Sequence, residues 1–135
     1  MPCTRRSERH VIAAEAGAVR ALLERLEGSP ALLALTQDER DCTLLVLAEA
    51  MNNVVEHGYD GGSGWIGVAM RPGRGWRIID GARRVPEGVG VSAMPSGAAE
   101  GGFGWPLIRA LTEEVRLHRR LGKNVLTLRM RGGGG

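Results

Sequence analysis

The strongest constraint on the fold is a change of pattern at Gly58. Before it, apolar residues recur with helical spacing over residues 11–28 and again over residues 37–58. After it come short apolar runs, "GWIGVAMRP" and "GWRIIDGA", separated by a turn at Pro72–Gly73, which predict a β-hairpin. A closing run, "NVLTLRM", alternates like a further strand. The chain therefore predicts an α+β fold, with helices on one face of a mixed, mainly antiparallel sheet.

The helices carry start and stop signals. The second one has Thr36 with Glu39 three residues later, which is a capping box, and it stops at Gly58. A third helix opens at "GGFGWPLIRAL" and is expected to continue through "TEEVRLH". The first helix places a stripe of apolar residues on one side, namely Val11, Ile12, Ala16, Val19, Leu22, Leu23 and Leu26.

A chain of 135 residues fits one domain. Residues 1–10 form a basic N-terminal tail in this interpretation, and residues 11–131 form the single domain. Residues 83–102 are rich in Gly, Pro, Ser and Ala and are expected to form a lid loop, because loops this long are usually functional or disordered. Residues 132–135 are expected to form a flexible glycine tail.

Composition restricts the class of partner. The formal charge is +3, and the basic runs "TRRSER" and "RLHRRLGK" are not dense or aromatic enough to favour nucleic acid over a solvated surface. The two cysteines, Cys3 and Cys42, give neither a disulfide framework nor a metal-binding spacing. No segment is long and apolar enough to span a bilayer. We expect a cytoplasmic protein without nucleic-acid or membrane partners.

Three polar residues of the second helix, Glu49, Asn53 and His57, are spaced four apart and fall along one stripe. A carboxylate one turn from an amide suits a magnesium–phosphate site, since the amide oxygen is a hard ligand and the carboxylate can accept a proton. The spacing alone also fits a helix end that faces water.

Two further features could contact a ligand. Glycines before the third helix let backbone N–H groups approach an anion, although such turns also serve tight packing. Asp80 ends an apolar strand and is followed by Gly81, so it could accept a hydrogen bond from a purine amino group. An ordinary Asp-Gly hairpin turn is the alternative.

Taken in order, these features resemble the GHKL ATPase superfamily and, within it, the small anti-sigma factor/serine protein kinases. "LAEAMNNVVEHGY" resembles the N-box E-A-x-x-N-x-x-x-H, "GGFGWPLIRALTEEV" the G2 box, and "GKNVLTLRM" the closing strand. The resemblance covers nearly the whole chain, and the two boxes together are a specific signal.

The resemblance implies a two-layer, Bergerat-type α/β sandwich that binds ATP with Mg²⁺. It implies that Glu49 is the catalytic carboxylate, that Asn53 coordinates Mg²⁺, and that Asp80 contacts adenine. Thr127 is expected to support Asp80 from the neighbouring strand. The remaining positions that the resemblance assigns to nucleotide binding are Gly81, Gly101, Gly102, Phe103 and Gly104.

Kinases of this family phosphorylate a serine on a STAS-domain antagonist and sequester a sigma factor, so the resemblance implies a partner switch. It also implies a partner contact at Arg20 and a possible homodimer. One motif differs: the G1 box D-x-G-x-G is here Asp80-Gly81-Ala82-Arg83-Arg84. This difference favours an alternative, a catalytically weak or inactive module that acts by protein–protein binding only. A detached histidine-kinase ATPase module is disfavoured, because no dimerisation helix or phosphoacceptor segment precedes the domain.

Overall fold

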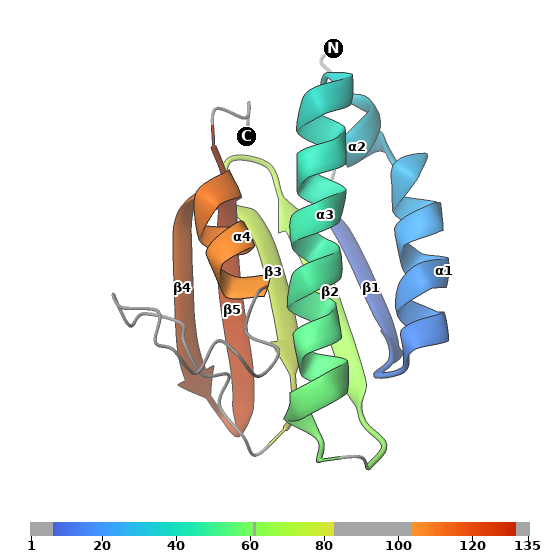
Figure 1. The fold of residues 1–135 in the computed structure, drawn as a ribbon, viewed down its shortest axis with the longest axis vertical. Helices are drawn as coiled ribbons and strands as arrows, with labels where there is room; N and C mark the ends of the chain where they lie inside the picture. The colour runs from blue at the N-terminus through green and yellow to red at the C-terminus, as the bar shows by residue number, and fades with distance from the viewer. Residues whose placement is uncertain (1–6, 61, 83–103, 132–135) are drawn as a thin grey trace.

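The computed structural model describes residues 7–60, 62–82 and 104–131, which form a sheet with helices on one of its faces (Figure 1). The elements in chain order are β1 (Glu8–Ala13), α1 (Ala16–Glu27), α2 (Pro30–Leu33), α3 (Gln37–Asn53), the π-helical turn η1 (Val54–Gly58), β2 (Trp65–Arg71), β3 (Gly75–Asp80), α4 (Gly104–Leu111), β4 (Thr112–Arg120) and β5 (Lys123–Met130).

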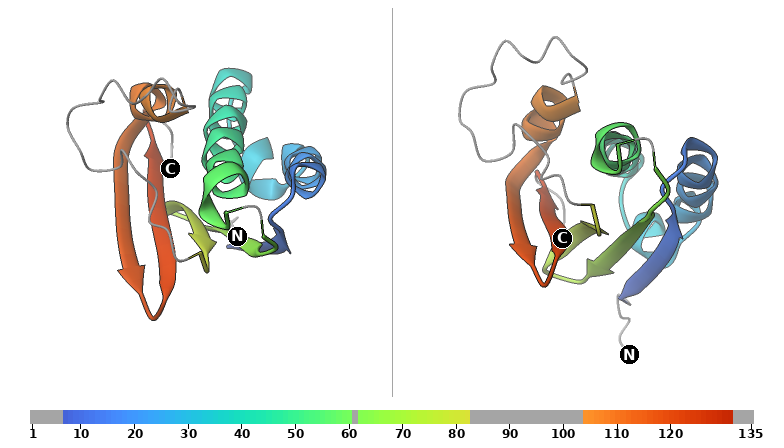
Figure 2. Two further views of the ribbon diagram at one scale, coloured as in Figure 1. Left: turned by 60° about the horizontal axis from the view of Figure 1, so that its bottom comes forward. Right: turned by 90° about the horizontal axis from the view of Figure 1, so that it is seen from below.

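The five strands lie in the order β1-β2-β3-β5-β4, and every described pairing is antiparallel. Figure 2 shows the two layers edge on, with the helices on one side of the sheet and the other side open. The fold class predicted from the sequence is therefore confirmed. Among the described residues, no helix is both long and apolar enough to cross a membrane.

The core lies between the sheet and the helices. Trp76 and Trp105 are each only 6% exposed and belong to it, whereas Trp65 is half-buried. Burial of such apolar side chains is the main favourable contribution to folding. The largest fully buried apolar side chains are Leu22, Leu26, Leu32, Leu47, Met51, Ile66, Ile78, Ile108 and Leu128.

Several local predictions are confirmed. The side chain of Thr36 accepts a hydrogen bond from the Glu39 N–H at 3.2 Å, and the Glu39 carboxylate accepts one from the Thr36 N–H at 3.0 Å. The predicted hairpin forms from β2 and β3, and Gly73 supplies the positive φ of +78° that its turn requires. The closing strand is β5.

Strand β1 corrects the expected N-terminal boundary. The structure places Glu8 to His10 in a strand rather than in the predicted tail, and it places Val11 and Ile12 in the same strand rather than in the predicted helix. Two of its half-buried side chains, Glu8 and His10, are polar, so the usual apolar alternation is missing.

Strand β4 is the second correction. Helix α4 ends at Leu111, where Thr112 Oγ1 donates a hydrogen bond to the Ile108 carbonyl at 2.7 Å. The segment expected to continue the helix is a strand in which Val115 and Leu117 pair with Leu128 and Leu126. The predicted lid (residues 83–102) and glycine tail (residues 132–135) lie outside the described residues.

Glu8 also replaces a missing helix cap. The N-cap of α2, Ser29, makes no side-chain capping bond, and the Glu8 carboxylate instead accepts the Ala31 N–H at 2.9 Å. The same carboxylate lies 3.5 Å from His10 Nε2. A polar side chain therefore points inward on β1 because it caps a helix of the other layer.

We expect Glu8→Ala to lower the free energy of unfolding by about 1–2 kcal/mol, because an N–H at the start of α2 loses its acceptor. The matched change Ser29→Ala should cost less than about 0.5 kcal/mol, since that hydroxyl caps nothing. Urea denaturation followed by tryptophan fluorescence measures both. A larger loss in Ser29→Ala than in Glu8→Ala would show that Ser29 is the cap.

Candidate functional site

The C-terminal half of α3 meets the start of α4 (Figure 1). The predicted carboxylate, amide and glycine come together at this junction. A Cβ added to Gly104 would lie 2.8 Å from Glu49 Oε1 and 3.5 Å from Asn53 Nδ2. A side chain at position 104 would therefore displace the end of the Glu49 carboxylate, so the glycine leaves room for that group at the junction. The other predicted glycine-turn residues, Gly101, Gly102 and Phe103, lie outside the described residues.

The Asn53 side chain lies at this junction, with Nδ2 3.5 Å from the position of a Cβ at Gly104. Its Nδ2 atom is buried and makes no hydrogen bond with any described residue. A buried polar atom without a partner is unfavourable, and at a helix junction it points to a ligand. An amide offers both an oxygen for Mg²⁺ and a donor for a phosphate oxygen.

Glu49 is half-buried one turn before Asn53, and no described cation forms an ion pair with it. A carboxylate in this position can accept a proton from a hydroxyl group. The stripe of polar groups ends at Asn53, because η1 follows with π-helical spacing. His57 is consequently exposed and lies 3.6 Å from the exposed Glu56 carboxylate, away from the junction.

Asp80 lies at the end of β3 and is only 3% exposed. Its Oδ1 accepts hydrogen bonds from the Ala82 N–H and from Asn124 Nδ2, both at 2.9 Å. Because both bonds end on Oδ1, Oδ2 is the carboxylate oxygen left for a ligand. A buried carboxylate oxygen of this kind selects a donor such as a purine amino group.

Asn124, not Thr127, supports Asp80. The register pairs Asp80 with Asn124, whereas Thr127 pairs with Arg77. Thr127 alternates with the buried Leu126 and Leu128, so it lies on the opposite face of the sheet from Asp80. The predicted role of Thr127 next to Asp80 is therefore corrected by the strand register.

The sequence interpretation missed Asn124 and Arg119. Arg119 Nη1 donates to Asn124 Oδ1 at 2.8 Å and to the Ala82 carbonyl at 3.0 Å. Asn124 must therefore present its amide nitrogen to Asp80, and Arg119 places a positive charge close to the buried carboxylate. The sequence did contain a signal for Asn124, because this polar residue alternates in phase with the apolar Leu126 and Leu128 and is therefore expected on the buried face of the strand.

The structure describes the first three residues of the altered G1 segment, Asp80 to Ala82. Ala82 is 2% exposed and has a negative φ, so its Cβ adds no backbone strain. Gly81 donates its N–H to the Tyr59 hydroxyl at 2.8 Å, and that hydroxyl donates to the Trp65 carbonyl at 2.7 Å. A Cβ on Gly81 would lie 3.0 Å from Trp65 Nε1, which explains a glycine there. Arg83 and Arg84 lie outside the described residues.

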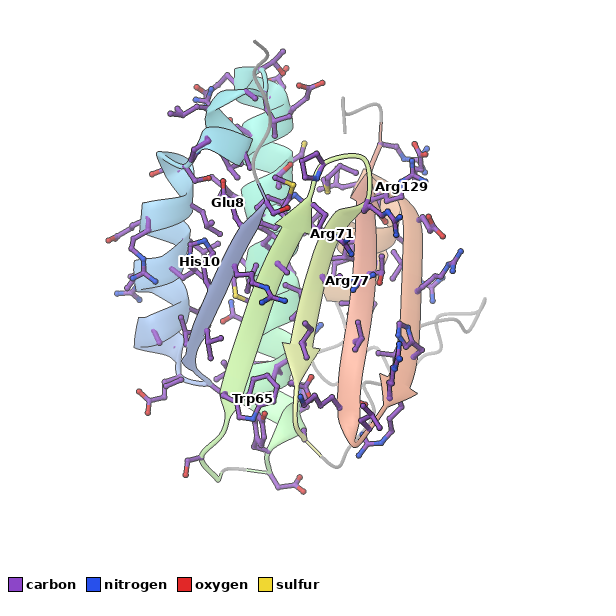
Figure 3. All side chains as sticks on the ribbon, turned by 180° about the vertical axis from the view of Figure 1, so that it is seen from behind. Glu8, His10, Trp65, Arg71, Arg77 and Arg129 are labelled. Atoms are coloured by element: carbon purple, nitrogen blue, oxygen red, sulfur yellow. The ribbon has the colours of Figure 1, made fainter. Side chains whose placement is uncertain are left out.

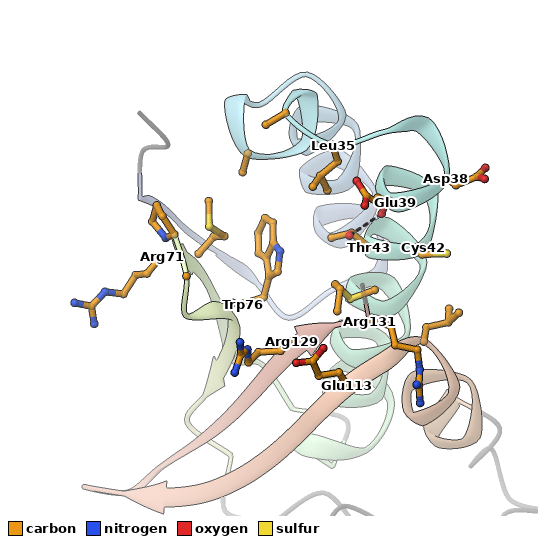
Figure 4. Close-up of a pocket in the computed structure, with 18 residues that line it drawn as sticks. Leu35, Asp38, Glu39, Cys42, Thr43, Arg71, Trp76, Glu113, Arg129 and Arg131 are labelled. Carbon is orange, nitrogen blue, oxygen red and sulfur yellow. Dashed lines mark hydrogen bonds between the residues drawn. The ribbon is translucent and has the colours of Figure 1, made fainter. Parts of the chain in front are cut away.

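A separate cavity of about 350 Å³ lies at the other end of α3 (Figure 4). It is bounded by α2, the start of α3, the β2–β3 turn and the ends of β5 and α4, and Trp76 and Leu35 line it. Thr43, which also lines it, is ten residues before Asn53, which corresponds to about 15 Å along a helix. None of the predicted site residues that the structure describes lines this cavity.

A family model described as a histidine kinase-like ATPase domain matches residues 12–130, almost the whole chain. This chain belongs to the histidine kinase-like ATPase domain family. No match was found among curated proteins. The histidine kinase-like ATPase domain binds ATP, and the site described above agrees with that function in its position between α3, α4 and the end of β3.

The residues present fit a magnesium–nucleotide complex. The unpartnered amide of Asn53 and the glycine at the α3–α4 junction suit phosphate and its metal, and Asp80 Oδ2 suits the base. Arg20, the predicted partner contact, is exposed on α1 and lies outside this site.

Substitutions at Asn124 and Thr127 test which of the two residues supports Asp80. We expect Asn124→Ala to lower the free energy of unfolding by about 1–3 kcal/mol, because Asp80 and Arg119 each lose a buried partner. It should also reduce the rise in melting temperature that ATP produces. Thr127→Val, on the other face of the sheet, should leave that rise unchanged. If only Thr127→Val abolished the rise in melting temperature that ATP produces, Thr127 rather than Asn124 would belong to the nucleotide site.

Proposed function

We propose that this protein is an ATP-dependent serine kinase and anti-sigma factor that acts as a partner switch. It phosphorylates a STAS-domain antagonist and sequesters a sigma factor when that antagonist is absent or phosphorylated. The observation that carries the proposal is the junction of Glu49, Asn53 and Gly104 beside the buried Asp80. The family match supports ATP binding, and the motif resemblance supports the serine kinase and its partners.

Each residue has a defined task in the proposed reaction. Asp80 Oδ2 accepts a hydrogen bond from the adenine amino group, and Asn53 and the N-terminus of α4 face the phosphates. Glu49 accepts the proton of the serine hydroxyl as that oxygen bonds to the γ-phosphorus and the bond to ADP breaks. Asn53 would help to hold magnesium together with the phosphate oxygens, and the metal would supply charge neutralisation when bound.

Arg20 supports the partner part of the proposal, because its side chain is exposed on α1 and free of described ion pairs. We place the switch in the cytoplasm, where its protein partners act. The homodimer that the resemblance implies stays a prediction.

A second candidate function is a binding-only module that has lost phosphotransfer. The observation that favours it is Ala82, which replaces a G1 glycine and whose carbonyl is already bonded to Arg119 and Asn124. The two candidates differ in phosphotransfer and agree on the fold and the protein partners.

Glu49→Gln tests the catalytic assignment. We expect it to reduce phosphorylation of a purified STAS-domain antagonist by at least about a hundredfold, because the neutral amide cannot accept the serine proton. Glu56→Gln, an exposed carboxylate on η1, is the matched control and should retain full activity. Incorporation of labelled phosphate from Mg-ATP measures both. Wild-type protein that binds ATP but transfers no phosphate would establish the binding-only module instead.

Gly104→Ala tests the junction itself. Its Cβ would displace the flexible end of Glu49, so we expect the free energy of unfolding to change by less than about 1 kcal/mol. Phosphotransfer should fall at least about tenfold, because the carboxylate moves from its productive position. Gly17→Ala, where nothing lies within 4 Å of the added Cβ, is the control. Full phosphotransfer activity in Gly104→Ala would contradict the catalytic role of Glu49.

A further inference from the structure

The face of the sheet turned away from the helices carries a strongly basic surface (Figure 3). Strand alternation and register bring basic side chains from all five strands to this face. Glu114 is the one acidic side chain on the described part of the face. The basic residues are Arg9, Arg71, Arg77, Arg116, Arg120, Lys123 and Arg129, and together with Glu114 we call this surface the basic face.

The positive charge on the basic face is mostly uncompensated within the described chain. Glu114 pairs with Arg116 at 2.6 Å and lies 3.6 Å from Arg129. Arg9, Arg71 and Arg77 form no ion pair with any described acid. Like charges gathered on one surface repel one another, so an acidic partner would stabilise them.

The charges form a regular row across the strands. The register connects Arg9 to Ala69, Ala69 to Arg77, Arg77 to Thr127 and Thr127 to Arg116. Arginines therefore stand on every second strand and are separated by about 10 Å, because neighbouring strands lie about 4.8 Å apart. Small or short side chains stand between them.

A parallel apolar row lies next to the arginine row. The register connects Val11 to Gly67, Gly67 to Ile79 and Ile79 to Val125. Val11 is 74% exposed and stands on the edge strand, so its side chain is accessible to a partner. The basic face thus combines a line of cations with a line of exposed or half-exposed apolar groups.

These two rows fit an amphipathic helix laid across the strands. Residues seven apart on an α-helix are about 10.5 Å apart along its axis, which is close to the arginine spacing. Carboxylates at positions i, i+7 and i+14 could therefore face Arg9, Arg77 and Arg116 in turn. Apolar residues beside that stripe would cover Val11 and Ile79.

Nucleic acid fits the face less well. Single strands bind to sheets mainly by stacking bases on aromatic side chains in the central strands. The two rows described above contain no aromatic residue on β1, β2, β3 or β5, and Trp65 stands at the end of β2, with Lys123 Nζ 5.9 Å from its ring centre. A second copy packed face to face would bring arginines against arginines.

We propose that the basic face binds a partner protein through an acidic amphipathic helix whose carboxylates repeat every seven residues. This surface is distinct from the nucleotide site and from the proposed contact at Arg20, both of which belong to the helical side. Phosphotransfer at the nucleotide site is not needed for this binding.

The test uses two synthetic helical peptides of identical composition, each labelled for fluorescence anisotropy. In the first, glutamates repeat every seven residues beside a leucine stripe; in the second, the same residues are permuted so that the glutamates surround the helix. We expect the first to bind at least about tenfold more tightly, and Arg77→Glu to weaken it by at least about tenfold. Arg25→Glu, on α1, should change its affinity less than about twofold.

Arg9→Glu, at an exposed edge position, gives a second variant and should also weaken the first peptide. Equal affinity for the two peptides, or full affinity in both variants, would overturn the proposal. So would tighter binding of an oligothymidylate or of phosphatidylserine vesicles, which would identify nucleic acid or a membrane as the occupant. Self-association that Arg77→Glu abolishes, measured by sedimentation, would assign the face to a second copy.

Discussion

Asp80 keeps its carboxylate at the end of β3, with only 3% exposure, because one donor from its own segment and one from β5 bond to it. The Ala82 N–H and Asn124 Nδ2 both bond to Oδ1, and Arg119 holds Asn124 in the orientation that this requires. A buried carboxylate without such donors would be strongly destabilising. The same arrangement leaves Oδ2 to select a ligand, so stability and recognition depend on the same group.

The helical layer completes the site because α3 and α4 approach closely at a glycine. Glu49 and Asn53 both reach this junction, where the missing side chain of Gly104 leaves room for the Glu49 carboxylate. The buried Nδ2 atom of Asn53 makes no hydrogen bond with any described residue. The base end and the phosphate end are connected through η1 and Tyr59, whose hydroxyl bonds both Gly81 and Trp65. The opposite side of the sheet is not covered by helices, and its residues form the basic face.

Local signals in the sequence predicted the parts of the fold whose residues follow simple patterns. The capping box at Thr36, the hairpin turn at Gly73 and the spacing of Glu49 and Asn53 depend on near neighbours, and the structure contains all of them. Strand β1 escaped prediction because Glu8 points inward to cap α2, a contact with residues 23 positions away. Asn124 escaped because its partner, Asp80, is 44 residues away and only the strand register brings them together.

The most direct test of this account is isothermal titration calorimetry of the wild-type protein with Mg-ATP and Mg-GTP. The Asp80 carboxylate is an acceptor that matches the amino group of adenine, whereas guanine presents a carbonyl oxygen at the equivalent position. The account predicts saturable binding of ATP with one site per chain and at least about tenfold weaker binding of GTP. No heat with ATP, or equal affinity for the two nucleotides, would contradict it.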